Sequence, residues 1–287
     1  MPDILHTPNR EQVVTSNTWA FLHWAHTIHG IDLPDWAALQ RWSLGDGPAF
    51  NAAIAAFARL PDVPLRLARQ SGQQEALVLR RVGGQRVALS RDHLRGPHPT
   101  PQSTPVQAGF LNEGEGLGLP TDIAAPLTRF WPPATLVRPL ADLLLHADLR
   151  ADDRVLVANA APWPWLVGLL EGTTVILAAA VTAATLMAVT ADERATVLVA
   201  PAQTIAEAAF QRARHRPNLA PLRTIIATGG PMSPEGRTRI YTWIKSDLLL
   251  LARTGDTVWG NPLEPVYAHP AAMPGLFTLR ASTPVPR

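Results

Sequence analysis

Two polar turns, each placed directly after an apolar run, are the part of this chain best suited to chemistry. The first turn is Thr228-Gly229-Gly230-Pro231, and it follows a buried strand predicted over residues 222–227. The second turn covers residues 253–257 and follows a second strand, predicted over residues 247–252, whose residues after Asp247 are apolar. In doubly wound α/β proteins, turns at the carboxyl ends of parallel strands are where small molecules bind. The sequence therefore predicts a small-molecule site at these two turns.

Alternating strands and helices are expected around this site, in the order typical of a parallel sheet. The glycine turn leads into a helix that Ser233 opens, with Pro234 at its first position. A strand, a helix, a strand and a helix are predicted upstream, over residues 173–177, 182–193, 196–199 and 204–214. The helical spacing of apolar residues predicts three helices near the amino terminus, over residues 19–28, 35–42 and 49–60. A hairpin around Gly83-Gly84 is predicted from strands 77–81 and 86–89, followed by a helix that Ser90 caps.

The site region resembles the adenylate-forming acyl-CoA synthetases, in particular their acetoacetyl-CoA synthetase branch. Three motifs carry the resemblance: TGGPMSPEG at 228–236, YTWIKSD at 241–247, and GNP with PVY within 260–267. Residues 18–50 and 140–200 are also similar to that branch. The resemblance implies an α/β fold, namely a partial amino-terminal domain of that family. Such a domain has a mostly parallel sheet flanked by helices, here with a helical amino-terminal cap.

The same resemblance implies a nucleotide site and an acyl site. In the family, the first turn lies against the adenine of ATP, and the second faces the phosphates and the acyl group. The implied ligands are therefore ATP or AMP with Mg²⁺, and CoA. The residues implied to bind the nucleotide are Thr228, Gly229, Gly230, Pro231, Thr254, Gly255 and Asp256. Trp163 and Trp165 are implied to line an acyl pocket, and packing in the core is the alternative role for both.

The chain departs from the family where the phosphates of ATP are bound. Family members carry a loop rich in Ser, Thr and Gly, with a lysine, where this chain has TRFWPPAT at 128–135. Proline removes a backbone donor and fixes φ, so this segment is not expected to wrap a triphosphate. The only lysine in the chain is Lys245. The second turn is also shortened and rearranged. Its Thr254-Gly255-Asp256 spells the family's ribose motif, but its neighbours place it at an earlier point of the family's sequence.

Four regions are expected along the chain. A helical cap and a hairpin occupy 1–95, and a Pro/Gly-rich linker at 96–139 replaces the phosphate-loop region. An α/β nucleotide- or acyl-binding domain occupies 140–270, and a tail occupies 271–287. The family continues into a β-rich subdomain and a mobile carboxyl-terminal domain with a catalytic lysine. Neither of these is expected in this chain.

Composition excludes several classes of protein. Of the 287 residues, 47% are hydrophobic, which is enough for a large core. The chain has no cysteine, so disulfides, thiolate metal sites and thiol nucleophiles are excluded. A formal net charge of only +2, with scattered arginines, argues against a nucleic-acid partner. His23, His26 and His29 share one helix face, but no carboxylate stands at matching spacing, so an exposed helix side is favoured over a metal site.

Residues 172–189 carry no charge and approach the length of a membrane-spanning helix. β-Branched residues crowd the first half of this segment and four threonines interrupt it. A strand, a turn and a helix are therefore favoured over a single membrane helix, and no membrane partner is expected. No export signal is visible at the amino terminus, so a cytoplasmic location is expected.

Three functions follow from these observations. The favoured one is a degenerate acetoacetyl-CoA synthetase-like protein without full ligase activity, which keeps a nucleotide or acyl-CoA pocket and has a binding or regulatory role. The alternative is a minimal acyl-CoA ligase that activates a small keto acid, with Arg129 replacing the loop lysine and Asp256 holding Mg²⁺. The third is a structural protein without a ligand. Association with itself or with a protein partner is expected, because a shortened sheet exposes apolar edges.

Overall fold

A computed structural model of the chain describes residues 3–57, 78–82, 85–89, 117–120, 127–131, 142–150, 152–158, 174–178, 181–212, 217–230, 232–254, 257–268 and 276–277. Its main element is a seven-stranded sheet with the strand order β13-β11-β10-β9-β8-β6-β7. Its strands are β6 (Arg154–Ala158), β7 (Thr174–Ala178), β8 (Val197–Pro201), β9 (Thr224–Thr228), β10 (Leu249–Thr254), β11 (Thr257–Trp259) and β13 (Leu276–Phe277). Strands β10, β9, β8, β6 and β7 run parallel, whereas β11 and β13 are added in antiparallel pairs. The predicted fold, a mostly parallel sheet flanked by helices, is confirmed.

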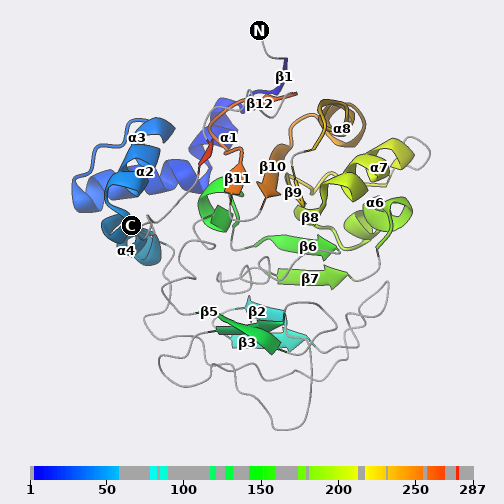
Figure 1. Ribbon diagram of the computed structural model, residues 1–287, viewed down its shortest axis with the longest axis horizontal. Coiled ribbons are helices and arrows are strands. Elements are labelled where there is room, and N and C mark those ends of the chain that lie inside the picture. The colour runs from blue at the N-terminus through cyan, green and yellow to red at the C-terminus, as the bar shows by residue number, and fades with distance from the viewer. Residues whose placement is uncertain are drawn as a thin grey trace, which may run out of the picture.

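Helices α6 (Ala183–Asp192), α7 (Ala202–Arg212) and α8 (Pro234–Arg239) lie together beside the parallel strands (Figure 1). Their shared core includes Leu198, Ile225 and Leu250 from three neighbouring strands. The next residue on β8, Val199, and the next on β9, Ile226, are also buried, although they point to the other face. Burial of both faces explains why these strands read as continuous apolar runs rather than as an alternating pattern.

The amino-terminal helices form a second cluster on the other side of the sheet (Figure 1). They are α1 (Arg10–Val14), α2 (Asn17–His29), α3 (Trp36–Gly45) and α4 (Gly47–Phe57). Their core is aromatic, with Phe21 buried against the rings of Trp42, Phe50 and Phe57. Leu144 and Leu145, from the π-helical turn η2 (Asp142–His146), complete this cluster. The predicted helical cap is therefore present, and η2 joins it to the sheet.

Side chains at the helix ends explain where these helices begin. Ser16 accepts a hydrogen bond from the backbone N–H of Trp19, and Asp35 accepts one from that of Ala38. Ser233 accepts one from Gly236 at the start of α8, as its sequence predicts. Helix α8 continues into a second π-helical turn, η4 (Ile240–Ile244).

Three further strand pairs lie outside the large sheet. Strand β1 (Ile4–His6) pairs with β12 (Val266–Tyr267), and β2 (Val78–Val82) pairs with β3 (Gln85–Leu89) as the predicted hairpin. Strand β4 (Leu117–Pro120) pairs with β5 (Leu127–Trp131). Both of these strands fall within the predicted linker 96–139, and the sequence did not predict them, because Gly118 and Pro120 interrupt the pattern of a strand at β4. The helix predicted after Ser90 lies outside the described residues, and the division into four regions stays a prediction.

The uncharged segment 172–189 forms β7 and then α6, as its β-branched residues and threonines predict. In the part of the chain that the structure describes, no helix is both long enough and apolar enough to cross a membrane.

Candidate functional site

The register of the sheet places the two predicted turns side by side. Thr228, the last residue of β9, pairs with Pro201 of β8 on one side and with Arg253 of β10 on the other. All three residues lie at the carboxyl ends of parallel strands. The glycine turn after β9 and the end of β10 therefore share one edge of the sheet, as the sequence predicts.

The second turn is tighter than predicted. Arg253 and Thr254 belong to β10, Thr257 begins β11, and Thr254 pairs directly with Thr257. The predicted turn over residues 253–257 is therefore wrong for Arg253, Thr254 and Thr257, which lie in paired strands. An antiparallel hairpin allows this tighter turn, because closing it takes only two residues. The two residues are Gly255 and Asp256, which lie outside the described residues.

The first turn is built from two glycines with positive φ. Gly229 has a φ of 84° and Gly230 a φ of 143°. A Cβ added at either position would meet no heavy atom within 4 Å, so the backbone of this turn borders open space. Glycine is needed here for its conformation, since side chains disfavour these φ values, and its missing Cβ leaves room for a ligand to approach. Thr228 is half-buried and Gly229 is exposed.

The chain behind this turn is tightly packed. The ideal Cβ position of Gly236 lies only 2.8 Å from Cγ of Met232, so α8 approaches the buried Met232 closely. Arg237, one residue later, is fully buried and donates from Nη1 to the carbonyl oxygen of Tyr267 at 2.8 Å. Burial lowers the pKa of Arg237 from its usual value. These contacts hold the start of α8 in place and so fix the turn from behind.

Arg253 is a charged residue at this edge, which the sequence-based prediction placed in the second turn but did not name among the nucleotide-binding residues. It is only 7% exposed. Among the last two residues of each of the five parallel strands, it is the only one with a charged side chain. The sequence carries a signal for it, because an arginine directly after Leu249-Leu250-Leu251-Ala252 interrupts an apolar strand at its end.

The only lysine of the chain lies at the opposite edge of the sheet. Lys245 donates from Nζ to the carbonyl oxygens of Ala220 at 3.1 Å and Leu222 at 2.9 Å. It also lies 3.5 Å from a carboxylate oxygen of Asp247. Leu222 precedes β9, and Thr228 ends it, so a rise of 3.3 Å per residue separates the lysine from the glycine turn by roughly 15–20 Å. Lys245 therefore stabilises the entry into β9.

The segment in the place of the family's phosphate loop begins in a strand. Residues 127–131 form β5, and Arg129 pairs with Leu119 of β4. Backbone groups of a paired strand bond to its partner, whereas a phosphate loop turns successive N–H groups toward the ligand. Residues 132–135, the rest of this segment, lie outside the described residues.

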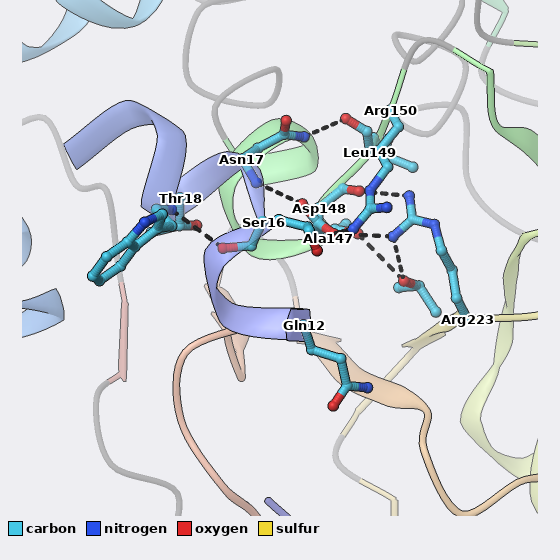
Figure 2. A network of polar contacts seen from close by, with 12 residues as sticks. Gln12, Ser16, Asn17, Thr18, Ala147, Asp148, Leu149, Arg150 and Arg223 are labelled. Carbon is cyan, nitrogen blue, oxygen red and sulfur yellow. Dashed lines mark hydrogen bonds and ion pairs between the residues drawn. The ribbon is translucent and has the colours of Figure 1, made fainter. Parts of the chain in front are cut away.

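A polar network around Asp148 and Arg223 stabilises the fold at the amino-terminal edge of the sheet (Figure 2). Arg223 bonds Asp148 through Nη1 at 3.3 Å and bonds Asp153 through Nε at 3.2 Å and through Nη2. Asn17 at the start of α2 donates its backbone N–H to Asp148 Oδ1 at 2.7 Å. Arg150 adds a bond to Asp148 Oδ2 at 2.9 Å. The network thus ties the cap, the turn after η2 and the start of β9 together.

Burial raises the pKa of the Asp148 carboxyl, although Arg223, Asn17 and Arg150 all act to lower it. Asp148 also has a φ of 51°, which is uncommon for a residue other than glycine. The sequence-based prediction missed this network, because its bonds join residues as many as 131 positions apart. The network faces the edge opposite the glycine turn, so its role is structural.

His146 is buried beside this network. Its Nδ1 lies 2.8 Å from the carbonyl oxygen of Gly260, and since a carbonyl only accepts, Nδ1 carries the proton. Burial lowers the pKa of His146 to about 3, so the ring is neutral at physiological pH. Its ring packs edge-on against Trp36 of α3. His146 therefore connects the cap to the segment after β11.

Comparison with known proteins agrees with the motifs and the fold. No protein-family model matches the chain. Acetoacetyl-coenzyme A synthetase of Rhizobium meliloti (strain 1021) is 32% identical over 159 residues, which are 50% of this chain and 24% of that protein. The solved acetoacetyl-CoA synthetase from Streptomyces lividans superposes with a TM-score of 0.61 at 14% identity, over 93% of this chain and 67% of that one. The chain resembles acetoacetyl-CoA synthetases in sequence and in fold.

The chain spans about a quarter of the length of the Rhizobium synthetase that it matches. Of the residues predicted to bind a nucleotide, the structure brings Thr228, Gly229 and Gly230 to one edge and places Thr254 at the end of the neighbouring strand. The others, Pro231, Gly255 and Asp256, lie outside the described residues, as do the predicted acyl-pocket residues Trp163 and Trp165. Their roles stay predictions.

The predicted exposed helix side of α2 is observed, since His23, His26 and His29 are all exposed. Within the described ranges, no three His, Asp or Glu side chains lie close enough together to hold a metal ion.

Proposed function

We propose that this chain binds a nucleotide or an acyl-CoA at the carboxyl edge of its sheet and does not itself activate a carboxylic acid by adenylation. The observation that carries the proposal is the position of Lys245. The only lysine of the chain bonds two carbonyl oxygens at the edge opposite the glycine turn. It therefore stabilises the fold there and is too far away to act on a ligand at the turn.

The binding half of the proposal rests on the glycine turn. Gly229 and Gly230 present backbone to open space, and the half-buried Thr228 stands beside them. A flat aromatic ring, such as adenine, can lie against a backbone that has no Cβ in the way. The resemblance to acetoacetyl-CoA synthetases supports a nucleotide at this place. AMP, ATP with Mg²⁺, and CoA or its acyl esters are the ligands that we propose to test.

The non-catalytic half of the proposal rests on the phosphates. Adenylation moves negative charge onto the leaving pyrophosphate, and it requires donors and cations placed around the phosphates. Residues 127–131 form a paired strand where the family has a glycine-rich loop, and Pro132 and Pro133 follow. Removing one preorganised donor from an enzyme costs about 10²–10³ in rate. The loss of a loop and its lysine together leaves little catalysis.

A binding protein of this kind acts through a partner or through the amount of ligand that it holds. We propose a regulatory or ligand-binding role in the cytoplasm, with a protein partner or a second copy of the chain. The strand order of the described sheet ends at β7, which β2 contacts, and at β13, and an uncovered edge strand is a natural site for pairing with another chain. Light scattering at micromolar concentration tests this, and a monomer with ligand bound contradicts the association.

Calorimetric titration and a pyrophosphate-release assay together test the proposal. AMP, ATP with Mg²⁺, and acetoacetyl-CoA are titrated into the purified chain, and pyrophosphate release is then measured with ATP, acetoacetate and CoA. Binding without pyrophosphate release is the expected result. Pyrophosphate release that disappears in Arg129→Ala contradicts the proposal and establishes the minimal ligase instead. Neither binding nor release, by a chain that folds normally, leaves a structural role.

A further inference from the structure

Arg253 lies on the same face of the sheet as Thr228. Side chains alternate along a strand, and Leu250 and Ala227 belong to the face that α6, α7 and α8 cover. Thr228 and Arg253 therefore point to the other face, and they are direct neighbours in the register of β9 and β10. Figure 1 shows these two strands side by side in the middle of the sheet. The side chain of Arg253 therefore leaves β10, the strand next to β9, whose end leads into the glycine turn.

The position of Arg253 within β10 limits its movement. Strand β10 is an interior strand, paired along its length with β9 and, at residues 252–254, with β11. Arg253 itself is 7% exposed, so most of its stem and head are packed. A binding group carried by a paired strand is held more precisely than one carried by a loop. A preorganised guanidinium also loses less side-chain entropy for each hydrogen bond that it forms.

The charge of Arg253 matters because of what surrounds it. The carboxyl ends of the other parallel strands are Ala158, Ala178, Pro201 and Thr228, and none of them carries a charge. Arg253 therefore brings a full positive charge to the carboxyl ends of these strands. A guanidinium presents paired N–H donors that match phosphate and carboxylate oxygens.

We infer that Arg253 binds the anionic group, phosphate or carboxylate, of the ligand that lies at the glycine turn. The inference rests on the proposed function, because it needs a ligand at that turn. It assigns the two parts of the edge to different tasks. The glycine turn accepts the flat or apolar part of the ligand, and Arg253 selects ligands that carry a negative charge.

Pairs of ligands, one member with the anionic group and one in which that group is missing or esterified, test this inference. AMP is compared with adenosine to test for phosphate, and acetoacetate with methyl acetoacetate to test for carboxylate. Titrations are made with the wild-type chain and with Arg253→Gln. The expected result is that wild type binds the anionic member of one pair roughly 10- to 100-fold more tightly, since a charge-assisted hydrogen bond contributes this much to affinity. In Arg253→Gln that preference disappears, while the neutral ligand binds as it does to wild type.

Two controls keep the result interpretable. Arg41→Gln removes the same charge from an exposed position on α3 in the cap, and it should leave both preferences unchanged. Arg253→Lys keeps the charge and loses the planar pair of donors, so an intermediate preference is expected. Thermal melting of each variant shows whether it is folded. If Arg253→Gln does not fold, the comparison within wild type and in Arg253→Lys still decides the question.

The possible failures differ from one another. If wild type binds adenosine and AMP equally, and binds acetoacetate and methyl acetoacetate equally, the inference is wrong while the proposed site stands. An anion preference that survives in folded Arg253→Gln also overturns the inference. If wild type binds none of the four ligands, and binds neither ATP nor acetoacetyl-CoA, the proposed function fails and the inference fails with it.

Discussion

At the amino-terminal edge of the seven-stranded sheet, Arg223 bonds two buried carboxylates, whereas at the carboxyl-terminal edge a turn of two glycines borders open space. The first edge joins three parts of the chain through side-chain bonds that span as many as 131 positions in the sequence. The second edge has its backbone exposed and one buried arginine beside it. Side chains that bond each other hold a fold together, while a backbone that borders open space, as at Gly229 and Gly230, leaves room for a ligand. The predictions below test this difference.

Removing Arg223 should have the largest effect on stability. Its side chain is 24% exposed, but those of its partners Asp148 and Asp153 are only 7% and 3% exposed. In Arg223→Met, these carboxylates stay buried without their main cation, which costs about 3–5 kcal/mol of unfolding free energy. Urea unfolding followed by circular dichroism measures the change.

Arg154→Met is the matched control for Arg223→Met. Arg154 begins β6 and bonds Glu193, but its side chain is 39% exposed. An exposed pair contributes little, so this variant should lose only about 1 kcal/mol. Equal losses in the two variants contradict the view that the network around Arg223 holds the amino-terminal edge together.

His146 should make stability depend on pH. Burial lowers its pKa in the folded state to about 3, from an ordinary value of 6.5. Below pH 6.5 the unfolded chain therefore binds a proton that the folded chain excludes, and stability falls as the pH falls. Each pH unit in this window costs at most about 1.4 kcal/mol, so a loss of about 2 kcal/mol is expected between pH 7 and pH 5.

His146→Gln isolates this contribution. Glutamine does not titrate, so the part of the pH dependence that belongs to His146 should disappear, even if the variant is less stable at every pH. Asp148 acts in the opposite direction, because its raised pKa favours the folded state as the pH falls. An unchanged slope of stability between pH 7 and pH 5 in His146→Gln shows that another group causes the dependence.

Local patterns in the sequence predict much of the fold but little of the amino-terminal network. Apolar runs followed by Gly229-Gly230 predict β9 and its turn, since only glycine suits the positive φ values that the structure has there. Ser233 and Pro234 predict the start of α8 through capping. By contrast, the contact between Asp148 and Arg223 joins residues 75 positions apart, and no local spacing in the sequence predicts it. The pair of β4 and β5 is local, and it was missed for a different reason, because Gly118 and Pro120 hide the pattern of a strand.

The candidate site divides in the same way. The position of Thr228 beside β10 follows from the rule that parallel strands end at a common edge. The burial of Arg253 does not follow from any pattern, because it depends on how the strand is paired and covered. An arginine within an apolar strand is the signal that a sequence offers for such a residue, and it indicates a place to look rather than a contact.

Gly229→Ala compares the candidate site with an equivalent glycine elsewhere. Gly30, the carboxyl-terminal cap of α2, has a φ of 65°, and Gly229 has a φ of 84°, and a Cβ at either would meet no atom within 4 Å. Alanine at either position adopts a disfavoured backbone conformation and should cost about 1 kcal/mol of stability. Only Gly229→Ala adds a methyl group where the ligand is proposed to lie. Calorimetric titration should therefore show weaker AMP binding for Gly229→Ala and wild-type binding for Gly30→Ala.

The smallest effect is expected from Lys245, and it separates a structural lysine from a catalytic one. Lys245→Met loses two bonds to carbonyl oxygens, on a side chain that is 28% exposed, so water replaces them and the loss of stability should stay near 1 kcal/mol or below. Lys245→Arg keeps donors at this place and should recover part of that loss. Because the lysine lies at the amino-terminal edge, AMP binding should be unchanged in both variants. A folded Lys245→Met that no longer binds AMP contradicts the assignment of the two edges, since the lysine would then reach the ligand or control its site from the far end of β9.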